Sequence, residues 1–266
     1  MHPEDGAKIS RGTIYVAPPD VHMVVIDGRV RLTRGPRQNR HRPSIDTLFR
    51  SAAYAFGSRV IAAVLTGSLR DGTVGLRAIH SRGGVTIVQD PKDAKFPGMP
   101  RSALQSATVD HCVPLAGIAP LMVSLAAEPV PDEAPRPTKE LEMEVRHDQG
   151  DLSVDLDHLG KPSYFTCPEC HGTLWEIRDG ELRYRCRVGH GYSAEGLIGH
   201  MDESLENTLW AAARALVETA HLKERVTKRL EEKNPELAQR LRAESTLTRR
   251  RADAIKKILT EDKPIS

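Results

Sequence analysis

The chain has 266 residues, of which 39% are apolar and 28% charged, and a mean hydropathy of −0.41. This composition is polar for one compact globule, so we expect two or more unequal units. A net charge of +2 gives no global attraction to nucleic acid or anionic lipid. No apolar run is long enough to cross a bilayer and the start does not resemble a signal peptide, so we expect a cytoplasmic protein without membrane insertion.

Residues 1–128 predict an α/β domain with a parallel, doubly wound sheet. In chain order we expect strands over 13–17, 22–26 and 29–33, a helix over 43–57, a strand over 60–65, a helix ending near 81, a strand over 84–88, and helices near 101–107 and 115–127. Asp27-Gly28 is typical of a tight hairpin turn. The β-α-β order implies parallel strands, and functional residues gather beyond their carboxyl ends, where Thr66 to Gly72 lie.

The second half divides into three further segments. Residues 129–160 are expected to be a Pro-rich, acidic linker, with at most a short strand near 141–145. Residues 161–193 hold three of the four cysteines. Residues 194–262 are helical apart from a break at Asn234-Pro235, and predict an antiparallel helical hairpin or coiled coil. Its apolar stripe on the first helix consists of Leu197, Met201, Leu205, Leu209, Ala212 and Leu216.

The cysteine spacing predicts a structural zinc site. Cys167-Pro-Glu-Cys170 and Cys186-Arg-Val-Gly-His190 are separated by fifteen residues that contain the turn signal Asp179-Gly180. A hairpin at that turn would bring together three thiolates and one imidazole, which fill a tetrahedral zinc shell and leave no position for a catalytic water. Metal binding is then expected to supply most of the folding free energy of this small module.

Three other interpretations of the same residues stay open at this point. The cysteines could be reduced and simply packed, or the ligands could hold iron. His171 or His200 could replace His190 as the fourth ligand.

Four motifs follow one another in the first 127 residues. They are Gly12-Thr-Ile-Tyr-Val-Ala-Pro-Pro19 with His22, Asn39-Arg-His-Arg-Pro-Ser-Ile-Asp46, Leu65-Thr-Gly-Ser-Leu-Arg-Asp-Gly72 with Gly75, and Phe96-Pro-Gly-Met-Pro100. In this order they resemble the chemotaxis receptor methylesterase domain of the CheB type, over about residues 4 to 127. The cysteine module with its long helix is similar to a C-terminal extension of some members of that family.

The resemblance implies a Ser-His-Asp hydrolase, and Asp71 falls on the triad aspartate that holds the histidine tautomer. The nucleophilic serine and the general-base histidine belong to motifs upstream of Met1, so we expect a truncated, mis-started or degenerate member, N-terminally incomplete. Ser68-Leu69 also stand where the family commonly has Met-Gly, which adds a hydroxyl and a bulky side chain beside the site.

Other catalytic arrangements in this chain are disfavoured by their sequence context. Ser68 or Ser44 with His41 could form a serine-histidine pair, but neither serine lies on the strained turn that exposes a nucleophile. Without the resemblance, Asp71 before a glycine would be interpreted as a turn residue. Cys112 and His111 are neighbours on a predicted strand and point to opposite faces, which favours a buried free cysteine.

Two functions are expected from these observations. The resemblance implies a protein-glutamate methylesterase, a carboxylic ester hydrolase that acts on glutamate methyl esters in the cytoplasmic methylation region of chemoreceptors, inactive as written because Ser and His are missing. The alternative is a noncatalytic signalling or adaptor protein in which the zinc module and helices bind a partner, or in which 194–262 self-associates. The Arg-rich residues 240–251 are interpreted as a solvated helix face because Glu244 interrupts them and aromatic residues are only 4% of the chain, which argues against nucleic acid.

Overall fold

The structure is a computed structural model that describes residues 1–130, 134–178 and 180–261. The chain forms two compact units, Met1–Leu197 and Ile198–Ser266. The stretches predicted as linker (129–160) and cysteine module (161–193) lie inside the first unit. None of the described helices is long and apolar enough to span a bilayer.

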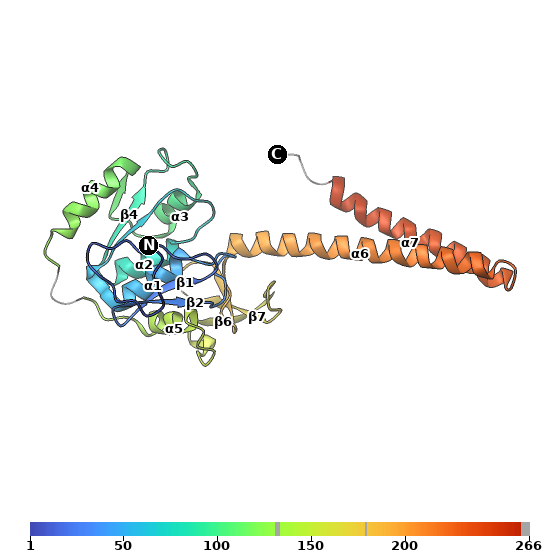
Figure 1. Cartoon of the computed structure of the whole chain (residues 1–266), viewed down its shortest axis with the longest axis horizontal. Helices are drawn as coiled ribbons and strands as arrows, with labels where there is room; N and C mark the ends of the chain where they lie inside the picture. The colour runs from blue at the N-terminus through green and yellow to red at the C-terminus, as the bar shows by residue number, and fades with distance from the viewer. Residues whose placement is uncertain (131–133, 179, 262–266) are drawn as a thin grey trace. The chain divides into compact units, whose positions relative to one another are not determined.

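A parallel sheet with helices packed against both faces forms the α/β part, as the sequence predicts. Its strands are β3 (Ile61–Val64), β4 (Val85–Gln89) and β5 (His111–Val113), in that spatial order, and its helices are α2 (Thr73–Ser81), α3 (Gly98–Ser106) and α4 (Leu115–Ala126) (Figure 1). Val64 and Val88 share one core with α2 and α3. Ile87 points to the opposite face and is fully buried, and α4 packs against β3 and β4.

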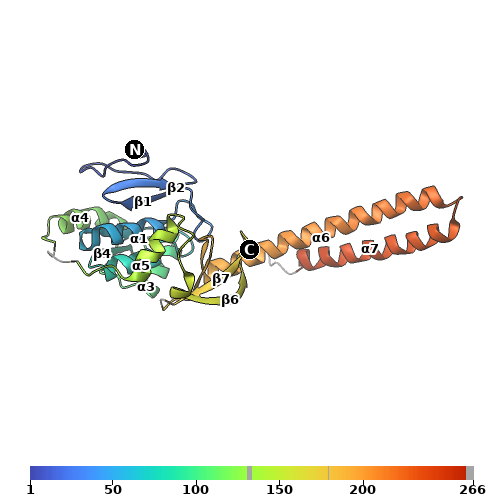
Figure 2. The same cartoon turned by 90° about the horizontal axis from the view of Figure 1, so that it is seen from below.

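A β-hairpin and one helix complete this part. β1 (His22–Ile26) pairs with β2 (Arg29–Thr33), and Asp27 and Gly28 take the positive φ values, 49° and 69°, that a tight hairpin turn requires. α1 (Ile45–Phe56) packs against both β1 and α2 (Figure 2). The strand expected over 13–17 is not formed. Ile14 is 80% exposed, so no hydrophobic face holds that run in a sheet.

Residues 139–148 form a helix, whereas the sequence suggested a short strand near 141–145. α5 (Lys139–Asp148) begins at Thr138, whose Oγ1 accepts a hydrogen bond from Leu141 N at 3.2 Å. Leu141, Glu144, Val145 and Asp148 are all buried, and their spacings of three and four residues place them on one face of a helix. Pro131, one of the four linker prolines, lies outside the described residues.

The cysteine module is a four-stranded antiparallel sheet preceded by a short 3-10 helix, η2 (Leu156–His158). Its strands are β6 (Gly160–Thr166), β7 (Thr173–Ile177), β8 (Arg183–Cys186) and β9 (Gly191–Ser193), in the order β6-β7-β8-β9. β7 and β8 form the expected hairpin, with Leu174 opposite Cys186. Asp179, in the predicted turn, lies outside the described residues.

Buried ion pairs join this module to the α/β part through α5. Asp148 accepts Arg50 of α1 at 2.6 Å on one carboxylate oxygen and Arg185 of β8 on the other. Glu144, one helical turn earlier, pairs with Arg183 of β8 at 2.6 Å. Burial alone would raise the pKa of Glu144, but the neighbouring arginines, Arg183 first, outweigh it and lower the pKa to about 2. Both acids are therefore ionised at neutral pH and hold the module to the domain.

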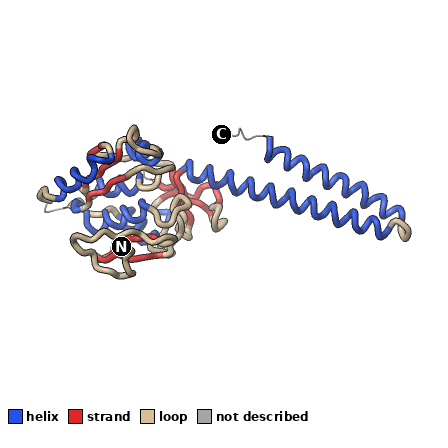
Figure 3. Tube along the Cα trace, turned by 45° about the horizontal axis from the view of Figure 1, so that its top comes forward, coloured by secondary structure: helices blue, strands red, loops and turns tan. Residues whose placement is uncertain are grey.

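The C-terminal region is a helical hairpin, α6 (Ala194–Leu230) followed by α7 (Pro235–Glu261), and the two helices run antiparallel (Figure 3). Asn234 caps α7, with its Oδ1 accepting from Leu237 N at 3.1 Å. The helices meet along small side chains spaced seven residues apart, all at most 3% exposed: Ala213, Ala220 and Thr227 on α6, and Ala238, Ser245 and Ala252 on α7. Ser245 Oγ donates to the Ala220 carbonyl at 2.9 Å, so the two backbones lie close.

This contact differs from the apolar stripe expected on α6. Leu209 and Leu216 are half-buried beside the small residues, but Met201 and Leu205 are exposed. The sequence therefore predicted the two helices but placed part of the α7-facing surface of α6 on the wrong residues. The expected stripe and the observed contact residues repeat with the same period along α6, so the period alone does not distinguish them.

The small-residue contact gives a testable prediction. Ala220→Leu should destabilise the helical hairpin by about 1–3 kcal/mol, because the added side chain would overlap the backbone region of Ser245. Thermal unfolding followed by circular dichroism at 222 nm measures this. Ala211→Leu, at an exposed position of the same helix, is the matched control and should leave the midpoint unchanged. Equal shifts in both variants would contradict the packing described.

Candidate functional site

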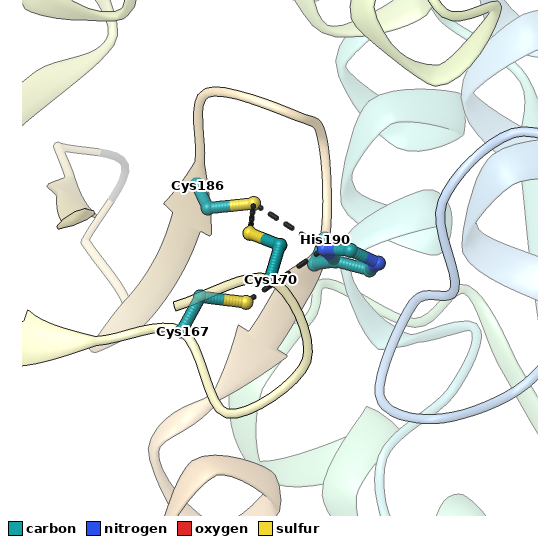
Figure 4. Close-up of side chains that lie close together, drawn as sticks. All are labelled: Cys167, Cys170, Cys186 and His190. Carbon is teal, nitrogen blue, oxygen red and sulfur yellow. Dashed lines mark hydrogen bonds between the residues drawn. The ribbon is translucent and has the colours of Figure 1, made fainter. Parts of the chain in front are cut away.

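Three cysteines and one histidine converge at one end of the cysteine module (Figure 4). Their ligand atoms, from Cys167, Cys170, Cys186 and His190, all lie within 4.8 Å of one another. Cys170 Sγ lies 3.5 Å from Cys186 Sγ, and His190 Nδ1 lies 3.4 Å from Cys186 Sγ and 3.7 Å from Cys167 Sγ. Ligands on a tetrahedral zinc with bonds of about 2.0–2.3 Å would be about 3.5–3.8 Å apart, so the spacing fits such an ion.

The polar groups around this cluster fit a metal site as well. His190 directs Nδ1 at the sulfurs, and its Nε2 lies 3.2 Å from Glu169 Oε2. A carboxylate on the far nitrogen of a ligating imidazole fixes its tautomer and orientation. Tyr192 donates its hydroxyl to the other oxygen of Glu169 at 3.0 Å. Sequence reasoning did not single out Glu169 or Tyr192, although Glu169 stands inside the first Cys-x-x-Cys motif.

The electrostatics of the cluster favour a cation. A hydrogen bond from the Cys186 thiol lowers the pKa of Cys167 well below its usual range, whereas the same hydrogen bond and burial raise the pKa of Cys186. One thiolate is thus stabilised within the cluster, and hydrogen bonds to Cys167 and Glu169 outweigh burial and raise the pKa of His190 to about 10. His171 is exposed and does not belong to the cluster, and neither does His200.

The second cysteine knuckle rests on the loop that leads into α1. Gln38 Nε2 donates to the Gly189 carbonyl at 2.9 Å, and Asn39 N donates to the Gly191 carbonyl at 2.7 Å. Asn39 also accepts from Ser193 N through its side chain at 2.7 Å. The knuckle that carries Cys186 and His190 is therefore hydrogen-bonded to the Asn39–Asp46 motif.

Asp71 lies where the sequence places it, between the carboxyl end of β3 and α2, and its carboxylate binds the start of α1. It accepts from Ser44 Oγ at 2.8 Å, Ile45 N at 2.8 Å and Asp46 N at 3.1 Å. Ser44, the N-cap residue, makes no capping hydrogen bond with its own side chain. Asp71 therefore satisfies the free backbone N–H groups of α1 from another segment, and it is only 7% exposed.

Asp46, in the first turn of α1, in turn accepts a hydrogen bond from the start of α2. Its Oδ1 accepts from Gly75 N at 2.8 Å, in the first turn of that helix. A side chain at Gly75 would collide with Phe49 of α1, so the glycine allows the two helices to approach closely. Burial, with the nearby charge of Asp71, raises the pKa of Asp46 to about 7. The starts of α1 and α2 are thus held together by two exchanged aspartates.

Histidine and serine side chains do lie near Asp71, but they are not connected as in a hydrolytic triad. The backbone N–H of Ser44 donates to His22 Nδ1 at 3.2 Å, so the proton is on Nε2, which donates to the Pro36 carbonyl at 3.1 Å. Both ring nitrogens are occupied by backbone groups, and burial lowers the pKa of His22. Ser44 Oγ donates to Asp71 directly, with no histidine between them.

The other residues considered in the sequence are not brought together. Ser68 and His41 are both exposed. Cys112 is an exposed free thiol, so the prediction that it is buried is wrong. It lies on β5, a three-residue strand at the edge of the sheet, which leaves one flank open.

Comparison with known proteins finds matches to the first half of the chain. The family model described as CheB methylesterase matches residues 1–122. Residues 1–122 thus match the CheB methylesterase domain. A protein-glutamate methylesterase/protein-glutamine glutaminase from Sulfurimonas denitrificans is 43% identical over 129 residues, which are 47% of this chain and 37% of that protein. One from Anaeromyxobacter dehalogenans is 40% identical over 129 residues, 47% of this chain and 36% of that protein.

A solved structure gives a further match. The CheB methylesterase catalytic domain of Thermotoga maritima is 32% identical, with a TM-score of 0.44, over 46% of this chain and 67% of that one. The present chain spans less than two thirds of the length of the two curated relatives named above. Residues 123–266, with the cysteine module and the helical hairpin, lie outside the CheB family match.

One departure from the CheB methylesterase pattern has a visible backbone consequence. Leu69 stands where the resemblance predicts glycine, and its φ is 65°, in the left-handed region that glycine adopts without strain. Its side chain is 48% exposed beside the loop of Asp71. A leucine in this conformation costs about 1–2 kcal/mol. Arg70, the next residue, pairs with Glu181 of the cysteine module at 3.2 Å, so this loop contacts the module directly.

The exchanged aspartates give a prediction on pH. Between about pH 4 and pH 7 the unfolded chain releases the Asp46 proton while the folded chain keeps it, so this residue makes the protein less stable as pH rises through that window. Asp46→Asn removes this contribution and still offers an oxygen to Gly75 N. The stability of the variant relative to the parent should therefore increase from pH 5 to pH 8.

Urea unfolding midpoints at the two pH values measure the difference. Asp27→Asn, in the exposed hairpin turn, is the control and should show the same offset from the parent at both. A pH-independent offset for Asp46→Asn would contradict the raised pKa.

Proposed function

We propose that residues 1–122 are the part of a protein-glutamate methylesterase that carries the triad aspartate, Asp71, and that residues 1–266 do not hydrolyse esters by themselves. The supporting observation is the position of Asp71 at the carboxyl end of β3, with its oxygens bound to Ser44 and the start of α1. Hydrogen bonds of this kind fix the position and orientation of the carboxylate, as the mechanism requires of a triad aspartate. The substrate would be a glutamate methyl ester in the cytoplasmic methylation region of chemoreceptors, and the protein would be cytoplasmic.

The nucleophile and the general base would have to come from residues other than 1–266. Within the described residues, His22 has both nitrogens committed to backbone groups and His41 is exposed, so neither bridges a serine to Asp71. In the reaction, the serine hydroxyl would attack the ester carbonyl, a histidine would take its proton, and methanol would leave. Asp71 would stabilise the protonated histidine.

A methanol-release assay on methylated chemoreceptor tests this proposal. The chain of residues 1–266 should release methanol at the rate of the protein-free blank, and Asp71→Asn should give the same rate. The Sulfurimonas denitrificans relative serves as the positive control. Hydrolysis above the blank that Asp71→Asn reduces by about 10²-fold or more would show a complete active site in this chain and overturn the proposal.

We further propose that Cys167, Cys170, Cys186 and His190 hold one structural zinc ion. Support comes from the ligand spacing and from Glu169 on the far nitrogen of His190. Bound zinc would neutralise the thiolates and cross-link the two knuckles. The same donors accept iron, so the identity of the metal is part of the test.

The zinc proposal predicts one zinc per chain by inductively coupled plasma mass spectrometry. Cys186→Ser should lose the metal and unfold the module at lower temperature, because the ion supplies much of its stability. Glu169→Gln should keep the site but bind zinc about 10–100-fold more weakly, measured by competition with a chromophoric chelator. Cys112→Ser is the matched control and should retain full metal. Stoichiometric iron, or full metal content in Cys186→Ser, would contradict the assignment.

The second candidate function is a noncatalytic adaptor, and two observations favour it. Asp71, the expected catalytic group, already serves as the cap of α1, and the cysteine module is joined to the same unit by buried ion pairs. In an adaptor, Asp71→Asn would lower the thermal stability of the first unit without changing partner binding. In a methylesterase reconstituted with its serine and histidine, the same variant would abolish methanol release.

A further inference from the structure

α6 carries a second apolar seam in addition to the one that packs against α7. Its positions alternate in steps of three and four residues and run almost the length of the helix: Ile198, Met201, Leu205, Thr208, Ala212, Ala215, Thr219, Leu222 and Val226. We call these residues the free seam. All are uncharged, although eleven of the 37 residues of α6 are Asp, Glu, Lys or Arg.

The free seam is exposed in the helical hairpin. Ile198 is 60% exposed, Leu205 59% and Leu222 63%. α7 covers the other seam instead, along Ala213, Ala220 and Thr227. Exposed leucines in a regular stripe of this length are typical of a helix that has a partner.

The period of the free seam indicates what kind of partner fits. Steps of three and four average 3.5 residues, the repeat that keeps one helix in continuous contact with another along a coiled coil. The packed seam tolerates the charged residues Asp202, Glu206 and Lys223, whereas the free seam contains none. A helix of similar length would therefore fit this seam.

Charge along α6 points to a second copy of the same helix, lying antiparallel. Up to Trp210 the helix contains Glu195, Asp202, Glu203 and Glu206 and no lysine or arginine, whereas Arg214, Lys223, Arg225, Lys228 and Arg229 follow, with only Glu218 and Glu224 among them. An antiparallel pair centred on Ala212 places the acidic half of each helix against the basic half of the other. A parallel pair would place like charges together, which is destabilising.

We propose that two copies of this chain associate through the free seams of α6 in an antiparallel four-helix arrangement, with α7 on the outside of each pair. In that register Leu205 lies beside Thr219 of the second copy. Asp202 and Lys223 lie at the border between the packed seam and the free seam, so Asp202 of one copy comes beside Lys223 of the other, while Lys223 Nζ also pairs with Glu244 of α7 at 3.0 Å. This self-association surface is an addition to the proposed function. The dimer does not depend on zinc binding or on ester hydrolysis, so either of those proposals could fail without affecting it.

Sedimentation velocity on the full chain over about 1–100 µM tests the proposal, with a dimer expected at the upper end, because association of this kind depends on concentration. The double variant Leu205→Glu/Leu222→Glu should weaken the dimer by at least about 100-fold, since loss of even one buried leucine corresponds to about tenfold. Both side chains are exposed in the single chain, so circular dichroism should show unchanged helix content. Leu247→Glu, at a 50% exposed position on α7, is the matched control and should leave the dimer intact.

The orientation has its own test. Asp202→Lys should weaken the antiparallel dimer about tenfold because it places two lysines side by side, whereas in a parallel dimer it would leave association unchanged or strengthen it. A chain that stays monomeric at 100 µM overturns the proposal. So does a dimer that Leu247→Glu disrupts as strongly as the double variant, or one that Asp202→Lys does not weaken.

Discussion

The carboxylate of Asp148 accepts two buried arginines that come from distant parts of the chain, Arg50 of α1 and Arg185 of β8. Each charge has lost its water, so the three groups are stable only together, and removal of one partner from a buried pair typically costs about 3–5 kcal/mol. α1 begins at the segment that Asp71 binds, and β8 ends at Cys186. The position of the aspartate site and that of the cysteine cluster therefore depend on the same buried salt bridge.

The same residues explain which parts of the structure the sequence could predict. Short stretches of sequence were sufficient to predict the parallel sheet, the hairpin turn at Asp27-Gly28 and the clustering of the cysteines. α5 was missed because its buried face carries Glu144, His147 and Asp148, which resemble solvent-facing residues until their arginine partners are known. The strand expected over 13–17 had the right composition but no partner strand. The fold of the first half was thus accessible from sequence, and the attachment of the module was not.

At the aspartate site, the sequence placed Asp71 by resemblance and by its position after a strand, but not by its contacts. The exchange of caps between Asp71 and Asp46 joins residues that are far apart in the chain, and only tertiary structure shows it. The exchange also explains why Asp71 is held firmly in a chain whose described residues offer it no histidine partner. Its oxygens satisfy helix N–H groups, which holds the carboxylate in place whether or not an ester is cleaved.

The contacts that join the cysteine module to α1 determine where this protein can be shortened. The family match ends at residue 122 and a proline-rich stretch follows, so this position would be the usual choice for a truncation. A polypeptide that stopped near residue 128 would lack Asp148, the counter-ion of Arg50, together with α5, which packs against α1. Gln38 and Asn39 would also lose the carbonyls that they bind. The compact unit that contains all of these partners extends to Leu197, so the segment that matches the family is shorter than the unit that packs together.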